Sequence, residues 1–121
     1  MPLYMTQFAY TPEAWATLVD NPEDRSAPVR ELTESMGGRL IGWYLSFGDY
    51  DGVLIYEAPD AASAGAAVLA AAKRGHLRAT KTTPLFTAEE GVEMMRRAGG
   101  TAFRAPGDQE GEPPPGLKAR H

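Results

Sequence analysis

Three side chains in this sequence have the chemistry that proton transfer requires. His76 titrates near neutral pH, which makes it the best single candidate for a general base or a proton donor. Asp51 and Tyr50 are weaker candidates, and they lie side by side in the segment Gly48-Asp49-Tyr50-Asp51-Gly52 between two apolar runs. Asp49 is not a candidate, because short polar residues in a turn commonly face solvent.

Each of these three residues also has a purely structural explanation. His76 follows Gly75 at the expected end of a helix, where the helix dipole alone favours a histidine. Asp51 can accept hydrogen bonds from local backbone donors and thereby fix a hairpin. Tyr50 can pack back on a neighbouring element while its hydroxyl keeps a polar partner. A catalytic role is therefore one of two alternatives for each residue.

Aromatic side chains are spread over the segments that we expect to form strands. They could line a cavity for a flat organic molecule, because small-molecule pockets are mostly apolar with a few polar groups. Equally, they could fill the core and an interface between subunits. The aromatic candidates for ligand binding are Tyr4, Phe8, Tyr10, Trp43, Tyr44 and Tyr56.

Arg78 is a further candidate for ligand binding, because it belongs to a basic cluster in an acidic protein. The cluster could receive a small carboxylate or phosphate. It could also be a solvated helix end that pairs with an acid such as Glu57. The other members of the cluster are Lys73, Arg74 and Lys81.

Composition excludes several classes of function. The formal net charge of -4 argues against a nucleic-acid partner, since proteins that bind the phosphate backbone carry clustered Lys and Arg. The absence of cysteine excludes disulfides, thiolate metal sites and a cysteine nucleophile. Asp49 and Asp51 do not match a calcium loop, because Val53 occupies the third ligand position. No nucleotide-binding glycine pattern is present, so we expect neither a metal nor a cofactor.

The sequence also shows no sign of a membrane partner. No apolar run approaches the ~20 residues that a membrane span needs. The first residues, Met-Pro-Leu-Tyr-Met-Thr-Gln-Phe, lack the basic start and long apolar segment of a secretion signal. We therefore expect a cytoplasmic protein.

The helices and strands that position the candidate residues can be predicted from residue composition and from helix start signals. Four segments are rich in β-branched and aromatic residues, and helix start signals stand at Thr11-Pro12, Ser26, Pro59-Asp60 and Thr87. The first helical segment is interrupted near Asp20-Asn21-Pro22, so we expect it to be broken or kinked. In the alanine-rich helix, Ala61, Gly65, Val68 and Ala72 are expected on the packed face. The predicted strands are 3–10, 39–47, 53–56 and 77–86.

The order of these elements predicts an α+β domain over residues 1–98. Strand, helix, strand, strand, helix, strand is the ferredoxin-like split βαββαβ arrangement, a four-stranded antiparallel sheet with the crossover helices on one face. A short C-terminal helix follows, and residues 99–121 are expected to be a mobile tail because they are rich in Pro, Gly and charged residues.

The strands are apolar on both faces, although helices are expected on only one of them. Strict alternation places Trp43 and Ile41 on one face, and Leu40 and Tyr44 on the other. The open face would then be an apolar patch too large for a soluble monomer. We therefore expect the chain to be its own partner, most simply in a twofold dimer.

The sequence resembles the GYD domain family of small bacterial proteins, which is named for a Gly, Tyr and Asp signature. The resemblance begins at Gly42-Trp43-Tyr44-Leu45, and Gly48, Tyr50 and Asp51 match the signature. It extends over roughly residues 3 to 95, ending near Leu85-Phe86-Thr87. It implies the fold of the ferredoxin-like dimeric α/β-barrel proteins, in which two sheets meet face to face. It implies no reaction and no catalytic residues.

Two functions remain open at this point. The first is a homo-oligomeric binding or regulatory module that holds a small organic ligand without altering it. The second is a cofactor-free enzyme like those of similar dimeric barrels, in which His76 or a tyrosine handles a proton in an aromatic cavity. The sequence contains no compact catalytic constellation, which places the binding module ahead.

Overall fold

The computed structural model describes residues 1–108, and the chain divides into two compact units, the first Met1–Leu85 and the second beginning at Phe86. The elements of the first unit are β1 (Leu3–Tyr10), α1 (Pro12–Asp20), α2 (Ser26–Ser35), β2 (Arg39–Leu45), β3 (Gly52–Glu57), α3 (Ala61–Ala72) and β4 (Leu77–Leu85). The sheet has the strand order β2-β3-β1-β4 with antiparallel neighbours, so the predicted ferredoxin-like fold is confirmed.

The helix of the second unit, α4 (Ala88–Gly99), was also predicted correctly. It begins with a capping box, in which the Thr87 hydroxyl accepts a hydrogen bond from the Glu90 amide at 3.1 Å and the Glu90 carboxylate accepts one from the Thr87 amide at 2.9 Å. Residues 101–108 contain neither helix nor strand. The rest of the predicted tail, 109–121, lies outside the described residues. None of the helices in the part of the chain that the structure describes has the length and hydropathy of a membrane span.

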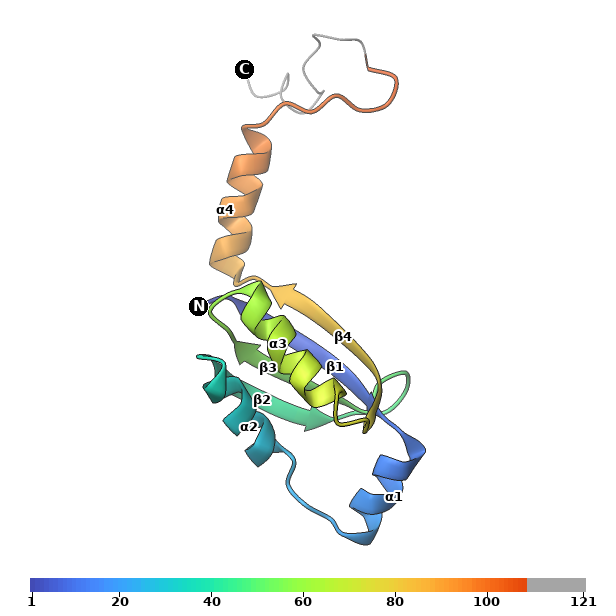
Figure 1. Ribbon diagram of the computed structural model, residues 1–121. Helices are drawn as coiled ribbons and strands as arrows, with labels where there is room; N and C mark the ends of the chain where they lie inside the picture. Colours follow the sequence, from blue (N-terminus) through green and yellow to red (C-terminus); the bar gives the residue numbers. More distant parts are fainter. Residues whose placement is uncertain (109–121) are drawn as a thin grey trace. The chain divides into compact units, whose positions relative to one another are not determined.

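Helices α2 and α3 lie over the same face of the sheet, as Figure 1 shows. The core forms between these two helices and the sheet, where Tyr4 and Tyr56 stack with ring centroids 5.9 Å apart. Helix α3 buries Ala64 and Ala67, whereas Ala61, Gly65 and Ala72 are exposed. The predicted packing face of this helix was therefore wrong for three of its four residues, and only Val68 of the four is half-buried. Alanine occurs on every side of α3, so periodicity could not distinguish its faces.

The alternation expected in β2 was also wrong. The register between β2 and β3 shifts between Leu40 and Gly42, because a bulge adds a residue to β2. The shift brings Leu40 and Trp43 to the core, opposite Tyr56 and Leu54. Tyr44 does not share the side of Leu40 and lies on the other face of the sheet, which we call the open face.

The first crossover between strands consists of two separate helices, as the break near residue 21 predicted. Thr11 caps α1 through a 3.1 Å hydrogen bond from the Ala14 amide, and Pro12 begins the helix. Residues 21–25 then connect α1 to α2, which is the helix that packs over the sheet (Figure 1). This connection places Arg25 immediately before α2.

The tip of the β2–β3 hairpin is bonded to the end of β1 through Asp51. The Asp51 amide donates to the Phe8 carbonyl at 2.7 Å. One carboxylate oxygen, Oδ2, accepts from the Tyr10 amide at 2.8 Å and from Nε1 of Trp15 at 3.1 Å. A register shift between Ala9 and Tyr10 accompanies this contact, and a buried amide that leaves the ladder needs another acceptor. Asp51 thus fixes the hairpin as predicted, but through remote donors rather than local ones.

Two glycines allow this hairpin to form. Gly48 has a φ of 112°, in the region that favours glycine, so the turn requires it. Gly52 pairs with Phe8 across the sheet, and a side chain at Gly52 would collide with the Phe8 ring. The first and last residues of the Gly48–Gly52 segment are therefore set by conformation and by close packing.

We predict that Asp51→Ala lowers the free energy of unfolding by roughly 2–4 kcal/mol, because two hydrogen bonds to a charged acceptor are lost. Asp51→Asn should cost about 1 kcal/mol, since the amide oxygen can still accept from both donors. Urea denaturation followed by circular dichroism measures both values.

The matched control is Asp49→Ala, two residues away on the same hairpin. The Asp49 side chain is exposed, so its removal should change stability by at most about 0.5 kcal/mol. An Asp51→Ala protein as stable as the Asp49→Ala protein would contradict the proposed anchoring.

Candidate functional site

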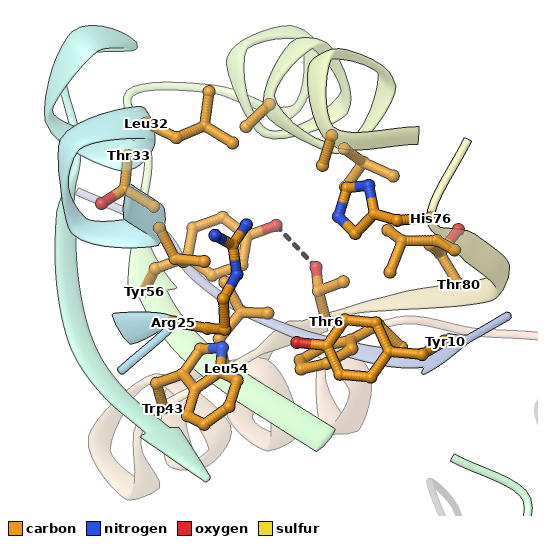
Figure 2. A pocket seen from close by; sticks show the side chains of 16 residues that line it. Thr6, Tyr10, Arg25, Leu32, Thr33, Trp43, Leu54, Tyr56, His76 and Thr80 are labelled. Atoms are coloured by element: carbon orange, nitrogen blue, oxygen red, sulfur yellow. Dashed lines mark hydrogen bonds between the residues drawn. The ribbon is translucent and has the colours of Figure 1, made fainter. Parts of the chain in front are cut away.

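A cavity of about 80 Å³ lies between the sheet and helices α2 and α3 of the first unit. Figure 2 shows its lining side chains converging from both layers. The walls are mostly apolar. The lining residues are Thr6, Phe8, Tyr10, Arg25, Val29, Leu32, Thr33, Trp43, Leu54, Tyr56, Ala67, Val68, Ala71, His76, Leu77 and Thr80.

The two basic side chains of the cavity, Arg25 and His76, lie far apart in the sequence, one just before α2 and the other just before β4. The Arg25 guanidinium points into the space that the labelled residues enclose in Figure 2. It pairs with Glu23 at 2.6 Å, and the Arg25 side chain is 30% exposed. The His76 ring lies near Tyr10, with ring centroids 6.2 Å apart. The His76 carbonyl accepts from the Thr11 amide at 3.0 Å, which holds the start of β4 against the end of β1.

Hydroxyl groups on the floor of the cavity are already paired with one another. Thr6 bonds the Tyr56 hydroxyl at 2.9 Å, marked in Figure 2, and the Thr82 hydroxyl at 2.9 Å. Burial raises the pKa of Tyr56, and its hydrogen bonds to Thr6 and Thr82 oppose that rise. Tyr56 is therefore a neutral phenol at neutral pH and contributes to the fold rather than to proton transfer.

His76 and Tyr10 have shifted pKa values. Burial lowers the pKa of His76 below its ordinary value, and the positive charges of Arg25 and Arg74 lower it further. Burial raises the pKa of Tyr10, while Arg25 acts in the opposite direction. At neutral pH the cavity thus contains a neutral imidazole, two neutral phenols and one permanent cation. Such a set can hold an anion, and the imidazole can accept a proton.

Five of the candidate residues proposed from the sequence line this cavity: Phe8, Tyr10, Trp43, Tyr56 and His76. The remaining ligand-binding candidates lie elsewhere. Tyr4 is in the core, Tyr44 is on the open face, and Arg78 is exposed with Nη2 3.4 Å from the Asp49 carbonyl. Glu57, the acid suggested as a partner for the basic cluster, is paired with Arg39 at 2.8 Å instead.

Asp51 and Tyr50 lie outside the cavity lining. Asp51 bonds Tyr10 and Trp15, as described above. Tyr50 is half-buried, and its carbonyl accepts from the Ser46 hydroxyl at 3.0 Å. Among residues 1–108 there is also no group of three or more His, Cys, Asp or Glu side chains that could hold a metal ion.

Sequence reasoning missed two lining residues that have a detectable signal. Arg25 stands just before a helix, where the dipole disfavours a cation, so a second role was a reasonable inference. Thr6 interrupts the apolar side of β1, between Tyr4 and Phe8, and a polar residue in such a position usually has a buried partner. Thr33 and Thr80 have no comparable signal.

We predict that the NMR titration of His76 has a midpoint below the ordinary histidine pKa of about 6.5. In Arg25→Gln the midpoint should rise, because a positive charge is removed. The unfolded chain binds the proton more readily than the folded one, so this histidine makes the fold less stable as the pH falls through about 6.5.

Comparison with His76→Asn assigns the signal, because the only other histidine is His121. A midpoint at or above the ordinary value, unmoved by Arg25→Gln, would contradict the placement of His76 in the cavity.

Comparison with known proteins gives one strong relative. A protein of Thermus thermophilus, named glutamine synthetase and cystathionine beta-lyase binding protein, is 36% identical over 78 residues, which are 64% of this chain and 82% of that protein. Two solved structures are similar at lower identity. TTHA0845, also from Thermus thermophilus, has 16% identity and a TM-score of 0.48, covering 73% of this chain and 96% of that one. A hypothetical protein, PHS023 from Pyrococcus horikoshii, has 12% identity and a TM-score of 0.45, covering 72% and 92%.

The antiparallel strand order β2-β3-β1-β4 establishes the fold. The family assignment rests on the sequence. The model of the GYD domain matches residues 4–95, a span that contains the hairpin signature and the cavity lining alike. The chain therefore belongs to the GYD domain family.

Proposed function

We propose that this chain is a binding module that acts as a homodimer and holds a small organic ligand in the cavity. The open face of the sheet would be the dimer interface. The observation that carries the proposal is the apolar character of that face, where Tyr44 is 59% exposed. Helices α2 and α3 both lie on the opposite face (Figure 1).

The strand register gathers the apolar residues of the open face into one patch. Met5 pairs with Ile55 across β1 and β3, and Val53 pairs with Tyr44 across β3 and β2. Toward β4 the same face becomes polar. Its residues there are Gln7, Lys81 and Thr83. An exposed apolar patch bordered by polar residues is typical of a protein interface, and a twofold axis would bury the patch against its own copy.

Protein partners are suggested by the relative from Thermus thermophilus. Its name says that it binds glutamine synthetase and cystathionine beta-lyase. We propose that this chain likewise binds other proteins, with those two enzymes as the first candidates. The relative matches 64% of this chain, so the family domain is the part expected to bind.

A cofactor-free enzyme is the second candidate function. It is favoured by one observation, that the neutral imidazole of His76 lines an apolar cavity together with the Tyr10 ring. The described cavity lining contains no carboxylate that could orient or assist this imidazole. Catalytic histidines usually have such a partner, so we place binding ahead of catalysis.

We predict that the full chain is a dimer at about 10 µM and that Tyr44→Lys makes it a monomer, because a charge buried within an apolar interface must lose its water. Size-exclusion chromatography with light scattering measures the mass. Tyr44 is exposed in the single subunit, so the variant should keep its fold and its circular dichroism spectrum.

Leu69→Lys is the matched control, since Leu69 is 70% exposed but lies on α3, on the helical side of the sheet. It should remain dimeric. A wild-type monomer at this concentration, or equal dissociation by Leu69→Lys, would refute the assignment of the open face.

For protein partners, we predict saturable binding to glutamine synthetase or cystathionine beta-lyase from the same organism, measured by biolayer interferometry with purified proteins. The dissociation constant should be about micromolar or lower, a range common for regulatory contacts. An unrelated enzyme of similar charge is the control. If neither enzyme binds, the proposal that this chain shares the protein partners of its relative is refuted. The dimer proposal would not be affected.

A further inference from the structure

The chemistry of the cavity lining restricts the ligand to a narrow class. Its only permanent charge is the Arg25 guanidinium, and the described lining contains no acidic side chain. The guanidinium has five N–H donors in a planar fork that matches a carboxylate. Glu23 accepts from one of its nitrogens at 2.6 Å, and this pair is exposed enough for water to weaken it. Donors of Arg25 are therefore available to an anion inside the cavity.

The other polar groups support an anion rather than a cation. Tyr10 and Thr80 contribute hydroxyls that can donate hydrogen bonds. The hydroxyls of Thr6 and Tyr56 are already bonded to each other, and Thr33 donates to the Arg30 carbonyl at 3.0 Å. The polar end of a ligand is thus expected near Arg25 and Tyr10, the two residues drawn close together in Figure 2.

The walls and the volume define the rest of the ligand. Phe8, Trp43, Leu54 and Val68 provide apolar surface, which favours a hydrocarbon group over a sugar or a second charge. The volume of about 80 Å³ is smaller than the ~150 Å³ cavity that accepts benzene. A chain of about two to four carbons is the size that such a space can hold.

We propose that this cavity binds a short-chain monocarboxylate, with its carboxylate on the Arg25 guanidinium and its hydrocarbon end against Phe8, Trp43 and Leu54. The inference rests on the proposed ligand-binding function and names the class of the ligand. It assigns Arg25 as the residue that selects an acid over a neutral molecule of the same shape.

The test compares butyrate with butyramide, which has nearly the same shape and no charge. Each is titrated into the ¹⁵N-labelled full chain, and amide shifts are followed by NMR. We expect saturable shifts around Thr6, Tyr10 and Thr80 with butyrate at a millimolar dissociation constant. Butyramide should bind about tenfold more weakly or not at all, because a charge-assisted hydrogen bond is lost.

Variants around the guanidinium test the selectivity. Arg25→Gln should weaken butyrate binding about tenfold and leave butyramide unchanged. Glu23→Gln should strengthen butyrate binding by a few-fold, because it removes the anion that competes for Arg25. Glu23 is exposed, so this second variant keeps the test valid if Arg25→Gln fails to fold.

Equal binding of butyrate and butyramide would overturn the monocarboxylate inference and leave a small-ligand function standing. Absence of saturable binding by either probe up to about 50 mM would overturn both that inference and the ligand part of the proposed function. Weaker butyrate binding in Glu23→Gln would overturn the role given to Arg25.

Discussion

The carboxylate of Asp51 is the constraint on which the arrangement of the site depends. It accepts from the Tyr10 amide and from the Trp15 indole, and the Asp51 amide donates to Phe8, so three bonds join the hairpin tip to the end of β1 and to α1. A buried amide outside the sheet ladder is costly unless it is paired. The bonds therefore fix where the chain leaves β1, and with it the start of the crossover that leads to Arg25.

The cavity follows from this arrangement. Tyr10, at the end of β1, contacts both Trp15 and His76 through their rings, and the His76 carbonyl accepts from Thr11. The connection at residues 21–25 then places a cation beside these groups. Side chains as far apart in the sequence as Tyr10 and His76 thus meet at one end of the sheet because the backbone around residue 10 is held in place. Asp51 positions the backbone around Tyr10 and does not line the cavity. The side chains that could contact a ligand are those of the cavity lining.

Much of the fold could be predicted from the sequence because the signals are local. Thr11-Pro12, Asp60 and Thr87 mark helix starts that the structure confirms, and the element order determined the topology. The bulge in β2 could not be foreseen, since one inserted residue leaves no mark on composition yet changes which side chains reach the core. The packed face of α3 could not be predicted either, because alanine and glycine give all sides of the helix a similar hydrophobicity.

The candidate site was predictable only in part. Phe8, Tyr10 and His76 were candidates from the sequence because of their residue types, and all three line the cavity. Phe8 and Tyr10 are two residues apart in β1, as expected for side chains that share a face of a strand. Arg25 was missed because it lies in the connection between α1 and α2. Only the tertiary fold, which sets the path of that connection, brings its side chain to the cavity. Tyr44 was grouped with the cavity aromatics, and the structure places it on the open face instead.

We propose that this family member is a dimeric module with a small ligand in each subunit, and native mass spectrometry of the full chain from its own organism is the most direct test. We predict a mass of two chains, with an increment for each retained small molecule that disappears under mild activation. A mass of one chain, of 13.0 kDa, without any retained molecule would contradict it.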